Sequence, residues 1–229
     1  MNDRSSGSAL IIGVGDGLSA SLARLLAREG YTLALASRDA DKLGKLAAET
    51  KASAHRCDAA DPAQVAALFQ AIGDLDVMIY NPSYRARGPL IDLDPAEVMR
   101  TLEITAFGAF LAGQQAARGM LRRGKGTILF SGASAGVKGY PRSAPFAMGK
   151  FALRGLAQSM ARELHPQGVH VGHVVIDGGI RSARRPDHPD GRDATLDPDS
   201  IAKSYLHLIR QPRDAWSWEI EVRPWVETF

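Results

Sequence analysis

Short apolar runs alternate with longer amphipathic stretches along this 229-residue chain, and that alternation restricts the fold more than any other feature. Its pattern predicts seven strands, at residues 8–13, 31–36, 52–57, 75–80, 126–131, 169–176 and 216–222. Helical periodicity predicts helices between them, at residues 17–28, 39–50, 62–72, 95–123, 143–165 and 198–210. Almost wholly apolar strands separated by helices indicate a parallel sheet covered on both faces. We therefore expect one doubly wound α/β domain with seven parallel strands over residues 1–229.

Composition excludes several classes of protein. A single cysteine, Cys57, rules out an internal disulfide framework and suits a reducing compartment. The 28 basic and 25 acidic residues give a net charge of only +3, so we expect no nucleic-acid partner. We find no apolar run near the roughly 18–20 residues that a membrane span needs, and the N-terminal stretch is polar. A soluble, cytoplasmic protein with no membrane partner is the expectation.

A glycine-rich turn joins the first predicted strand to the first predicted helix. It reads Gly13-Val-Gly15-Asp-Gly17-Leu-Ser19. Glycines permit unusual backbone angles there and let a pyrophosphate approach the positive N-terminus of the helix. The predicted phosphate-binding residues are Gly13, Gly15, Asp16, Gly17 and Leu18.

A second segment, Phe146-Ala-Met-Gly-Lys150, nearly matches the pattern Tyr-x-x-x-Lys. With the glycine turn, it makes the chain similar to the short-chain dehydrogenase/reductase family over nearly its whole length. The resemblance implies a Rossmann-type fold and a nicotinamide cofactor. The family turn Gly-x-x-x-Gly-x-Gly maps onto Gly13, Gly17 and Ser19, with serine in place of the third glycine.

The second predicted strand is followed by Ser37 and Arg38, where an acidic residue would bind the ribose 2′-hydroxyl of NAD. Serine and arginine suit a 2′-phosphate instead, so we expect NADP(H); a solvated loop charge is the alternative for Arg38. The resemblance further implies cofactor contacts from Asp58, Ala59, Asn81, Pro82, Ser83, Lys150, Gly178 and Ile180.

In the family, a tyrosine transfers the proton, a serine orients the carbonyl, an asparagine holds a water and a lysine binds the nicotinamide ribose. Here Lys150 is retained, whereas Phe146, Ala133 and Thr105 occupy the other three positions. Asp177 replaces the proline that normally cups the nicotinamide. The expected substrate pocket comprises Tyr84, Thr105, Ala133, Phe146 and Asp177.

The identity of a replacement hydroxyl is left open. Ser131 and Ser134 flank Ala133, and a shift of one residue would bring one of them into the serine position, so Ser134 is grouped with Lys150 as a catalytic candidate. Tyr84 or Tyr140 could supply a displaced acid, although both suit a loop or a pocket wall. A phenyl ring cannot take part in general acid catalysis, which is worth roughly two to four powers of ten in rate.

Arginines concentrate after the fourth and sixth predicted strands. They are Arg85, Arg87, Arg181, Arg184, Arg185 and Arg192. Both loops leave carboxyl ends of strands, where ligands of open α/β sheets bind. Two interpretations remain: a positive mouth for an anionic substrate, or ordinary solvated loop charge. The six histidines are scattered and no cysteine cluster accompanies them, so no metal site is expected.

These observations predict an atypical NADP(H)-dependent oxidoreductase that acts on a small molecule through a degenerate proton-transfer site. Quinones, flavins, iminium ions and activated alkenes need little electrophilic help and fit such a site. The alternative is an inactive NADP(H)-binding protein that serves as a regulator or partner subunit. The resemblance also implies a homodimer or homotetramer formed through the helices at residues 95–123 and 143–165.

Overall fold

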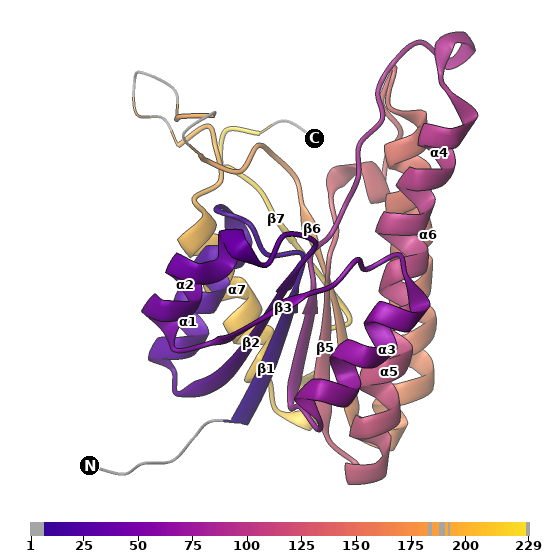
Figure 1. Ribbon diagram of the computed structural model, residues 1–229. Coiled ribbons are helices and arrows are strands. Elements are labelled where there is room, and N and C mark those ends of the chain that lie inside the picture. Colours follow the sequence, from indigo (N-terminus) through magenta and orange to yellow (C-terminus); the bar gives the residue numbers. More distant parts are fainter. Residues whose placement is uncertain (1–6, 183–184, 188–190, 192, 228–229) are drawn as a thin grey trace.

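Seven parallel strands form one sheet, in the order β3-β2-β1-β4-β5-β6-β7 (Figure 1). The computed structural model describes residues 7–182, 185–187, 191 and 193–227. The strands are β1 (Gly7–Ile12), β2 (Tyr31–Ser37), β3 (Ser53–Arg56), β4 (Val77–Tyr80), β5 (Gly126–Ser131), β6 (Val169–Ile176) and β7 (Glu219–Val222). The predicted doubly wound fold with seven parallel strands is confirmed.

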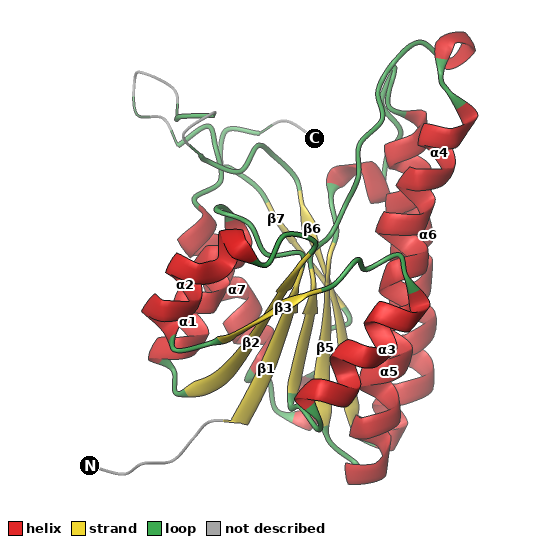
Figure 2. Cartoon of the chain, viewed as in Figure 1, coloured by secondary structure: helices red, strands yellow, loops and turns green. Residues whose placement is uncertain are grey.

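Helices cover both faces of the sheet (Figure 2). The first face carries α1 (Leu18–Arg28), α2 (Gly44–Thr50) and α7 (Pro198–Ile209). The second carries α3 (Pro62–Ile72), α5 (Gly108–Arg123) and α6 (Ala144–Leu164), with α4 (Pro95–Leu102) packed against α6. All residues of β4 and β6 are buried between these layers, which explains why β4 is continuously apolar and why β6 is apolar except for two buried histidines, His170 and His173.

Aspartate–proline pairs start three of the helices. Asp61 precedes Pro62, and its carboxylate accepts the backbone N–H groups of Ala63 and Gln64. Asp94 and Asp197 cap α4 and α7 in the same way, each before a proline. The carboxylate satisfies helix N–H groups that lack an intrahelical partner, and proline has no N–H to leave unsatisfied. These local signals explain why the three predicted helix starts agree with the structure.

Two predicted helices differ from the structure. The stretch 95–123 contains a π-helical turn, Glu103–Phe107, between α4 and α5. Its inserted residue turns Thr105 inward, where Gly149 of α6 packs so closely that a Cβ there would lie 3.1 Å from the Thr105 Cβ. The stretch 39–50 begins as a loop and a short 3₁₀ turn, Asp41–Leu43, so α2 starts only at Gly44.

The last predicted strand is shorter than expected, because the side chain of Trp216 turns away from the sheet edge. The Trp216 ring stacks on His170 with centroids 4.8 Å apart, and its Nε1 donates to the Gln211 carbonyl at 3.1 Å. Strand pairing with β6 therefore begins only at Glu219, opposite His173.

The strand order reverses direction at β1, which pairs with β2 on one side and β4 on the other. Ile12 lies opposite both Ala36 and Tyr80 at the carboxyl ends of these strands. Connections leave β1 and β4 in opposite directions along the sheet, so a crevice opens above their ends. This topological switch point positions the site described next.

Candidate functional site

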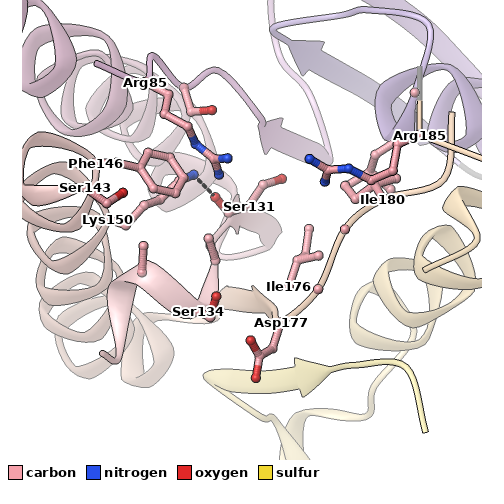
Figure 3. A pocket seen from close by; sticks show the side chains of 18 of the residues that line it. Arg85, Ser131, Ser134, Ser143, Phe146, Lys150, Ile176, Asp177, Ile180 and Arg185 are labelled. Atoms are coloured by element: carbon pink, nitrogen blue, oxygen red, sulfur yellow. Dashed lines mark hydrogen bonds between the residues drawn. The ribbon is translucent and has the colours of Figure 1, made fainter. Parts of the chain in front are cut away.

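A cavity of about 1080 Å³ opens above the carboxyl ends of β1, β4, β5 and β6. Loops that follow each of these strands line it, together with one side of α6 (Figure 3). The predicted site residues that line it are Gly13, Gly15, Gly17, Leu18, Asn81, Ser83, Ala133, Ser134, Phe146, Lys150, Asp177, Gly178 and Ile180. Those that do not are Asp16, Ser37, Arg38, Asp58, Ala59, Pro82, Tyr84 and Thr105.

The glycine turn closes one end of the cavity. Gly13 has φ of +81°, and a Cβ on it would lie 2.6 Å from the Pro82 nitrogen, so only glycine fits between β1 and the loop after β4. By contrast, a Cβ on Gly15 or Gly17 would meet nothing within 4 Å. Both glycines therefore expose their backbone to the cavity at the N-terminus of α1, which has no acidic residue in its first turn. Backbone N–H groups and the helix dipole fit a pyrophosphate there.

Ser19 holds this turn to the next strand. Its Oγ donates to the Gly13 carbonyl at 3.1 Å and accepts from the Asn81 Nδ2 at 2.7 Å. Asn81 in turn donates its backbone N–H to Ile12 at 3.0 Å. The serine thus replaces the third glycine of the turn with a hydrogen-bonded bridge, a role that the sequence alone did not reveal.

A second group of predicted residues lies at the ends of β2 and β3, outside the cavity wall. Ser37 and Arg38 end β2, and the Arg38 side chain is exposed with no carboxylate among the described residues within ion-pair distance. Asp39 is held by Lys42 at 2.7 Å. One oxygen of the Asp58 carboxylate accepts the Ala60 N–H at 3.0 Å, which orders the turn after β3. These residues flank the glycine turn on the side away from α6, where the adenosine half of a dinucleotide fits.

The opposite end of the cavity is formed by the segment after β6. Asp177 is buried, and its carboxylate pairs with Arg223 at 3.2 Å and Lys138 at 3.6 Å. Its backbone N–H donates to Val222, which continues the β6–β7 ladder. Gly178 and Ile180 follow, and Ile180 bridges to Leu196. Asp177 is therefore a neutralised structural carboxylate at the cavity wall.

Lys150 is the buried cation of the site, with only 3% of its surface exposed. Its Nζ donates to the Ser131 backbone carbonyl at 2.7 Å, as the dashed line in Figure 3 marks. Burial, with a smaller contribution from the positive charge of Arg85, lowers the pKa of Lys150 from 10.5 to about 7. The ammonium is therefore held on β5 and keeps donors available to a hydroxyl-bearing ligand.

Phe146 lies one turn before Lys150 on α6, also buried. The Lys150 Nζ is 5.8 Å from the centre of its ring. The Arg85 guanidinium carbon lies over the same ring, 4.0 Å from its centre. An aromatic ring between two cations provides an electrostatic platform, yet it has no proton to donate.

The hydroxyls near Phe146 differ in their availability. Ser131 Oγ lies 2.6 Å from the buried Tyr205 hydroxyl, so each already has a partner. Ser134 and Tyr140 line the cavity. Tyr84 points elsewhere, because its hydroxyl donates to the Glu97 carboxylate and its ring packs beneath Arg100. This hydrogen bond raises the pKa of Tyr84.

Thr105 lies behind the cavity. Its Oγ1 accepts the Tyr84 backbone N–H at 3.3 Å, and its side chain is fully buried beneath α6. The π-helical turn is what places it there, so its position could not follow from helical periodicity.

Arg142, Ser143 and Glu227 also line the cavity, and sequence reasoning missed all three. Ser143 directly precedes α6, where serine is a common residue, but its side chain makes no capping hydrogen bond. Glu227 lies 63 residues after the end of α6 at Leu164, and no local pattern distinguishes it.

The arginines divide into two groups. Arg181 is paired with Asp187 at 3.3 Å, Asp193 at 3.4 Å and Asp197 at 3.6 Å, so it holds its own loop together. Arg85, Arg87 and Arg185 line the cavity, and no described carboxylate lies within ion-pair distance of them. The predicted Arg184 and Arg192 lie outside the described residues.

Among the described residues, no histidine, cysteine and acidic side chains gather in groups of three that could hold a metal ion. No helix among them combines the length and apolar character needed to cross a bilayer.

Comparison with known proteins gives consistent matches. A family model described as short chain dehydrogenase matches residues 8–189. The 2-(S)-hydroxypropyl-CoM dehydrogenase 3 of Xanthobacter autotrophicus is 31% identical over 225 residues, which cover 87% of this chain and 88% of that protein. The glycine betaine reductase ATRR of Emericella nidulans is 27% identical, and the match covers 94% of this chain but only 18% of that longer protein.

Solved structures agree with the fold. A short-chain dehydrogenase from Rhodopseudomonas palustris is 34% identical with a TM-score of 0.83, covering 95% of this chain and 98% of that one. A metagenomic short-chain oxidoreductase in complex with NADP is 27% identical with a TM-score of 0.84, covering 97% and 99% respectively.

Proposed function

The chain belongs to the short-chain dehydrogenase family, and on this premise we propose that it is an NADP(H)-dependent oxidoreductase that lacks the usual phenolic acid. One observation carries the proposal. Lys150 is buried and bound to the Ser131 carbonyl, while the residue one turn earlier is Phe146. The site keeps the groups that hold a nucleotide and replaces the group that would protonate an oxyanion.

The residues present fit a dinucleotide along the whole crevice. Gly13, Gly15 and Gly17 would hold the pyrophosphate, since they open at the N-terminus of α1. Lys150 would bind the nicotinamide ribose, and Gly178 and Ile180 line the wall beside it. When bound, the nicotinamide supplies or accepts a hydride.

We propose NADP(H) rather than NAD(H) because of the charge at the end of β2. Arg38 is exposed and has no described carboxylate partner, and the neighbouring Asp39 is already neutralised by Lys42. A guanidinium at this position suits a 2′-phosphate. The NADP complex of the metagenomic relative supports the same choice.

The protein residues restrict the chemistry of the substrate. Neither Phe146 nor Ala133 can donate or accept a proton at the cavity wall. A substrate whose reduction needs little protonation in the transition state therefore suits this site best. Quinones, iminium ions and activated alkenes meet that requirement better than simple ketones.

Single-turnover kinetics test the proposal. NADPH-loaded protein is mixed with a panel of ketones, imines, quinones and activated alkenes, and NADPH oxidation is followed by absorbance. We expect stoichiometric oxidation by at least one acceptor of the last three classes, and slower reaction with ketones. Binding of NADPH without oxidation by any acceptor would refute the enzymatic role. It would favour an inactive nucleotide-binding regulator or partner subunit. That role is also consistent with the absence of a proton donor at Phe146 and Ala133.

We also propose a homo-oligomer formed through α4, α5 and α6. Several large apolar side chains on or between these helices are exposed in the single chain: Met99, Phe107, Phe110, Met148 and Phe151. The rings of Phe107 and Phe110 stack with centroids 6.3 Å apart, and they are 45% and 42% exposed. Large apolar side chains exposed together on neighbouring helices are typical of a protein–protein interface.

A further inference from the structure

Two guanidinium groups point toward one another across the cavity (Figure 3). Arg85 comes from the loop after β4, and Arg185 comes from the segment after β6. The two loops enclose the cavity from opposite sides. Arg85 lies on the side of Phe146 and Lys150, and Arg185 lies on the side of Ile180. The space between them is therefore bordered by positive charge from both sides.

Arg85 is held in place by the residue that distinguishes this chain. The central carbon of its guanidinium lies over the Phe146 ring, 4.0 Å from the ring centre. Partial burial, together with the charges of Arg87 and Arg185, lowers the pKa of Arg85. Phe146 thus has a positive role, because its aromatic face fixes an arginine side chain that would otherwise be free in solvent.

Arg185 is also positioned, by its backbone and by close packing. It exchanges both backbone hydrogen bonds with Ser182, at 2.9 and 3.0 Å. Its side chain lies against Gly179, where a Cβ would be 2.7 Å from the Arg185 Cδ and 2.8 Å from its Nη1. Any larger residue at position 179 would displace the guanidinium from the cavity wall.

Among the described residues, neither Arg85 nor Arg185 has an ion-pair partner. Among the described residues that line the cavity, two are acidic, Asp177 and Glu227. Asp177 is neutralised by Arg223 and Lys138, and Glu227 forms no ion pair with any described base. Arg181 comes from the same segment as Arg185 but has three aspartate partners. The two arginines of this segment therefore differ in whether a described carboxylate neutralises them.

The charges of Arg85 and Arg185 repel one another across the cavity, and an anion between them would relieve that repulsion. We infer that the cavity receives a substrate bearing a carboxylate, held between Arg85 and Arg185 with its reducible carbon beside Phe146 and Lys150. This inference rests on the proposed function, since it places the substrate in the same cavity as the nucleotide. A planar guanidinium fork on each side matches the two oxygens of a carboxylate.

A phosphate of the nucleotide offers the same oxyanion chemistry, so the test separates the two sources. Binding is measured by calorimetry, first of NADP⁺ alone and then of oxo acids to the protein saturated with NADP⁺. The probes are 4-oxopentanoate and 4-oxo-4-phenylbutanoate, each compared with its methyl ester. The variants are Arg85→Gln, Arg185→Gln and the charge-conserving Arg85→Lys, with Arg28→Gln on α1 as a matched control far from the cavity.

We expect at least one acid to bind at least tenfold more tightly than its ester. Arg85→Gln and Arg185→Gln should each remove that preference while leaving the affinity for NADP⁺ and for the ester within twofold. Arg85→Lys should retain part of the preference, and Arg28→Gln all of it.

Two results would overturn the inference. The first is equal affinity, or equal absence of binding, for acids and esters in the wild-type protein. The second is a loss of NADP⁺ affinity in the glutamine variants as large as the loss for the acids, which would assign the arginines to the nucleotide phosphates. Because no turnover is needed, acid-selective binding without NADPH oxidation would refute the redox function alone.

Discussion

Phe146 and Lys150 lie one turn apart on α6, both buried, with the ammonium 5.8 Å from the centre of the phenyl ring. The lysine is fixed from below by the Ser131 carbonyl, and the ring is covered from above by Arg85. The phenyl ring in this stack has no proton to give to a substrate oxygen, and each member of the stack is ordered by a specific contact.

Restoring a phenol should increase reduction of simple ketones. We expect Phe146→Tyr combined with Ala133→Ser to raise kcat/KM for a generic ketone at least tenfold, within the two to four powers of ten that general acid catalysis is roughly worth. The tyrosine ring preserves the contact with Arg85. Phe146→Leu serves as the control and should give no gain. An unchanged rate in the double variant would mean that the pocket has diverged beyond these two positions.

Lys150 should make the protein more stable as the pH rises above neutrality. Its pKa is about 7 in the folded chain and near 10.5 when unfolded, so the unfolded chain binds more protons between these values. The free energy of unfolding should therefore rise from pH 7.0 to 8.5, by at most about 2 kcal/mol. Below pH 7 the cost of burying the ammonium is fully present.

Urea unfolding of the wild type and of Lys150→Met at both pH values measures this contribution, and the variant should lose the rise. The interval stops below pH 9 because burial raises the pKa of Cys57 from 9.0 to about 11, an effect of opposite sign. An identical pH dependence in the two proteins would contradict the assignment.

Arg38 should select the phosphorylated cofactor. We expect Arg38→Gln to weaken NADPH binding about tenfold and to leave NADH binding unchanged, since a hydrogen bond to a charged group is worth roughly 1.5–3 kcal/mol. Fluorescence titration of both nucleotides measures the effect. Arg56→Gln, an exposed arginine at the end of β3, is the matched control. Equal losses for both nucleotides would show that Arg38 does not read the 2′-phosphate.

His173 should make the fold sensitive to mild acid. It is fully buried on β6, with its Nδ1 2.9 Å from Glu219, and burial lowers its pKa from 6.5 to about 4. Between these values the unfolded chain binds more protons, so the free energy of unfolding should fall as the pH drops from 6.5 to 5. The loss should be at most about 2 kcal/mol.

His173→Leu should remove this contribution, and chemical unfolding at pH 6.5 and pH 5 compares the two proteins. Burial also lowers the pKa of His170, so His173→Leu with His170→Phe should be flatter still. The bidentate pair of Arg154 and Glu219, at 2.7 Å for both contacts, remains in either variant. An acid response unchanged by His173→Leu would refute this origin.

The exposed phenylalanines should control assembly. We expect Phe110→Glu with Phe151→Glu to convert an oligomer into monomers, because two charges would be buried at the proposed interface. Light scattering coupled to size-exclusion chromatography gives the mass of each form. Ile91→Glu changes an apolar residue that is 92% exposed outside these helices, and it should leave the mass unaltered. A wild-type protein that is already monomeric would remove the basis of this prediction.

The fold could be read from the chain because its signals are local. The apolar run of β4 and the aspartate–proline starts of α3, α4 and α7 each act through neighbouring residues. A strand buried on both faces is mostly apolar, as β4 and β6 are. The glycine turn after β1 and the lysine of α6 were located from the motifs that they carry in the sequence.

The contacts that give the site its chemistry could not be read in that way. Arg85 and Phe146 are 61 positions apart, and their stacking depends on how the loop after β4 passes over α6. Tyr84 turns toward Glu97, and Thr105 is buried in the π-helical turn, so neither lines the cavity in which the family resemblance placed them. Arg181 is neutralised while Arg185 is not, although they lie four residues apart. Side-chain direction in loops follows from tertiary packing and from partners distant in the chain, and only the folded structure brings these together.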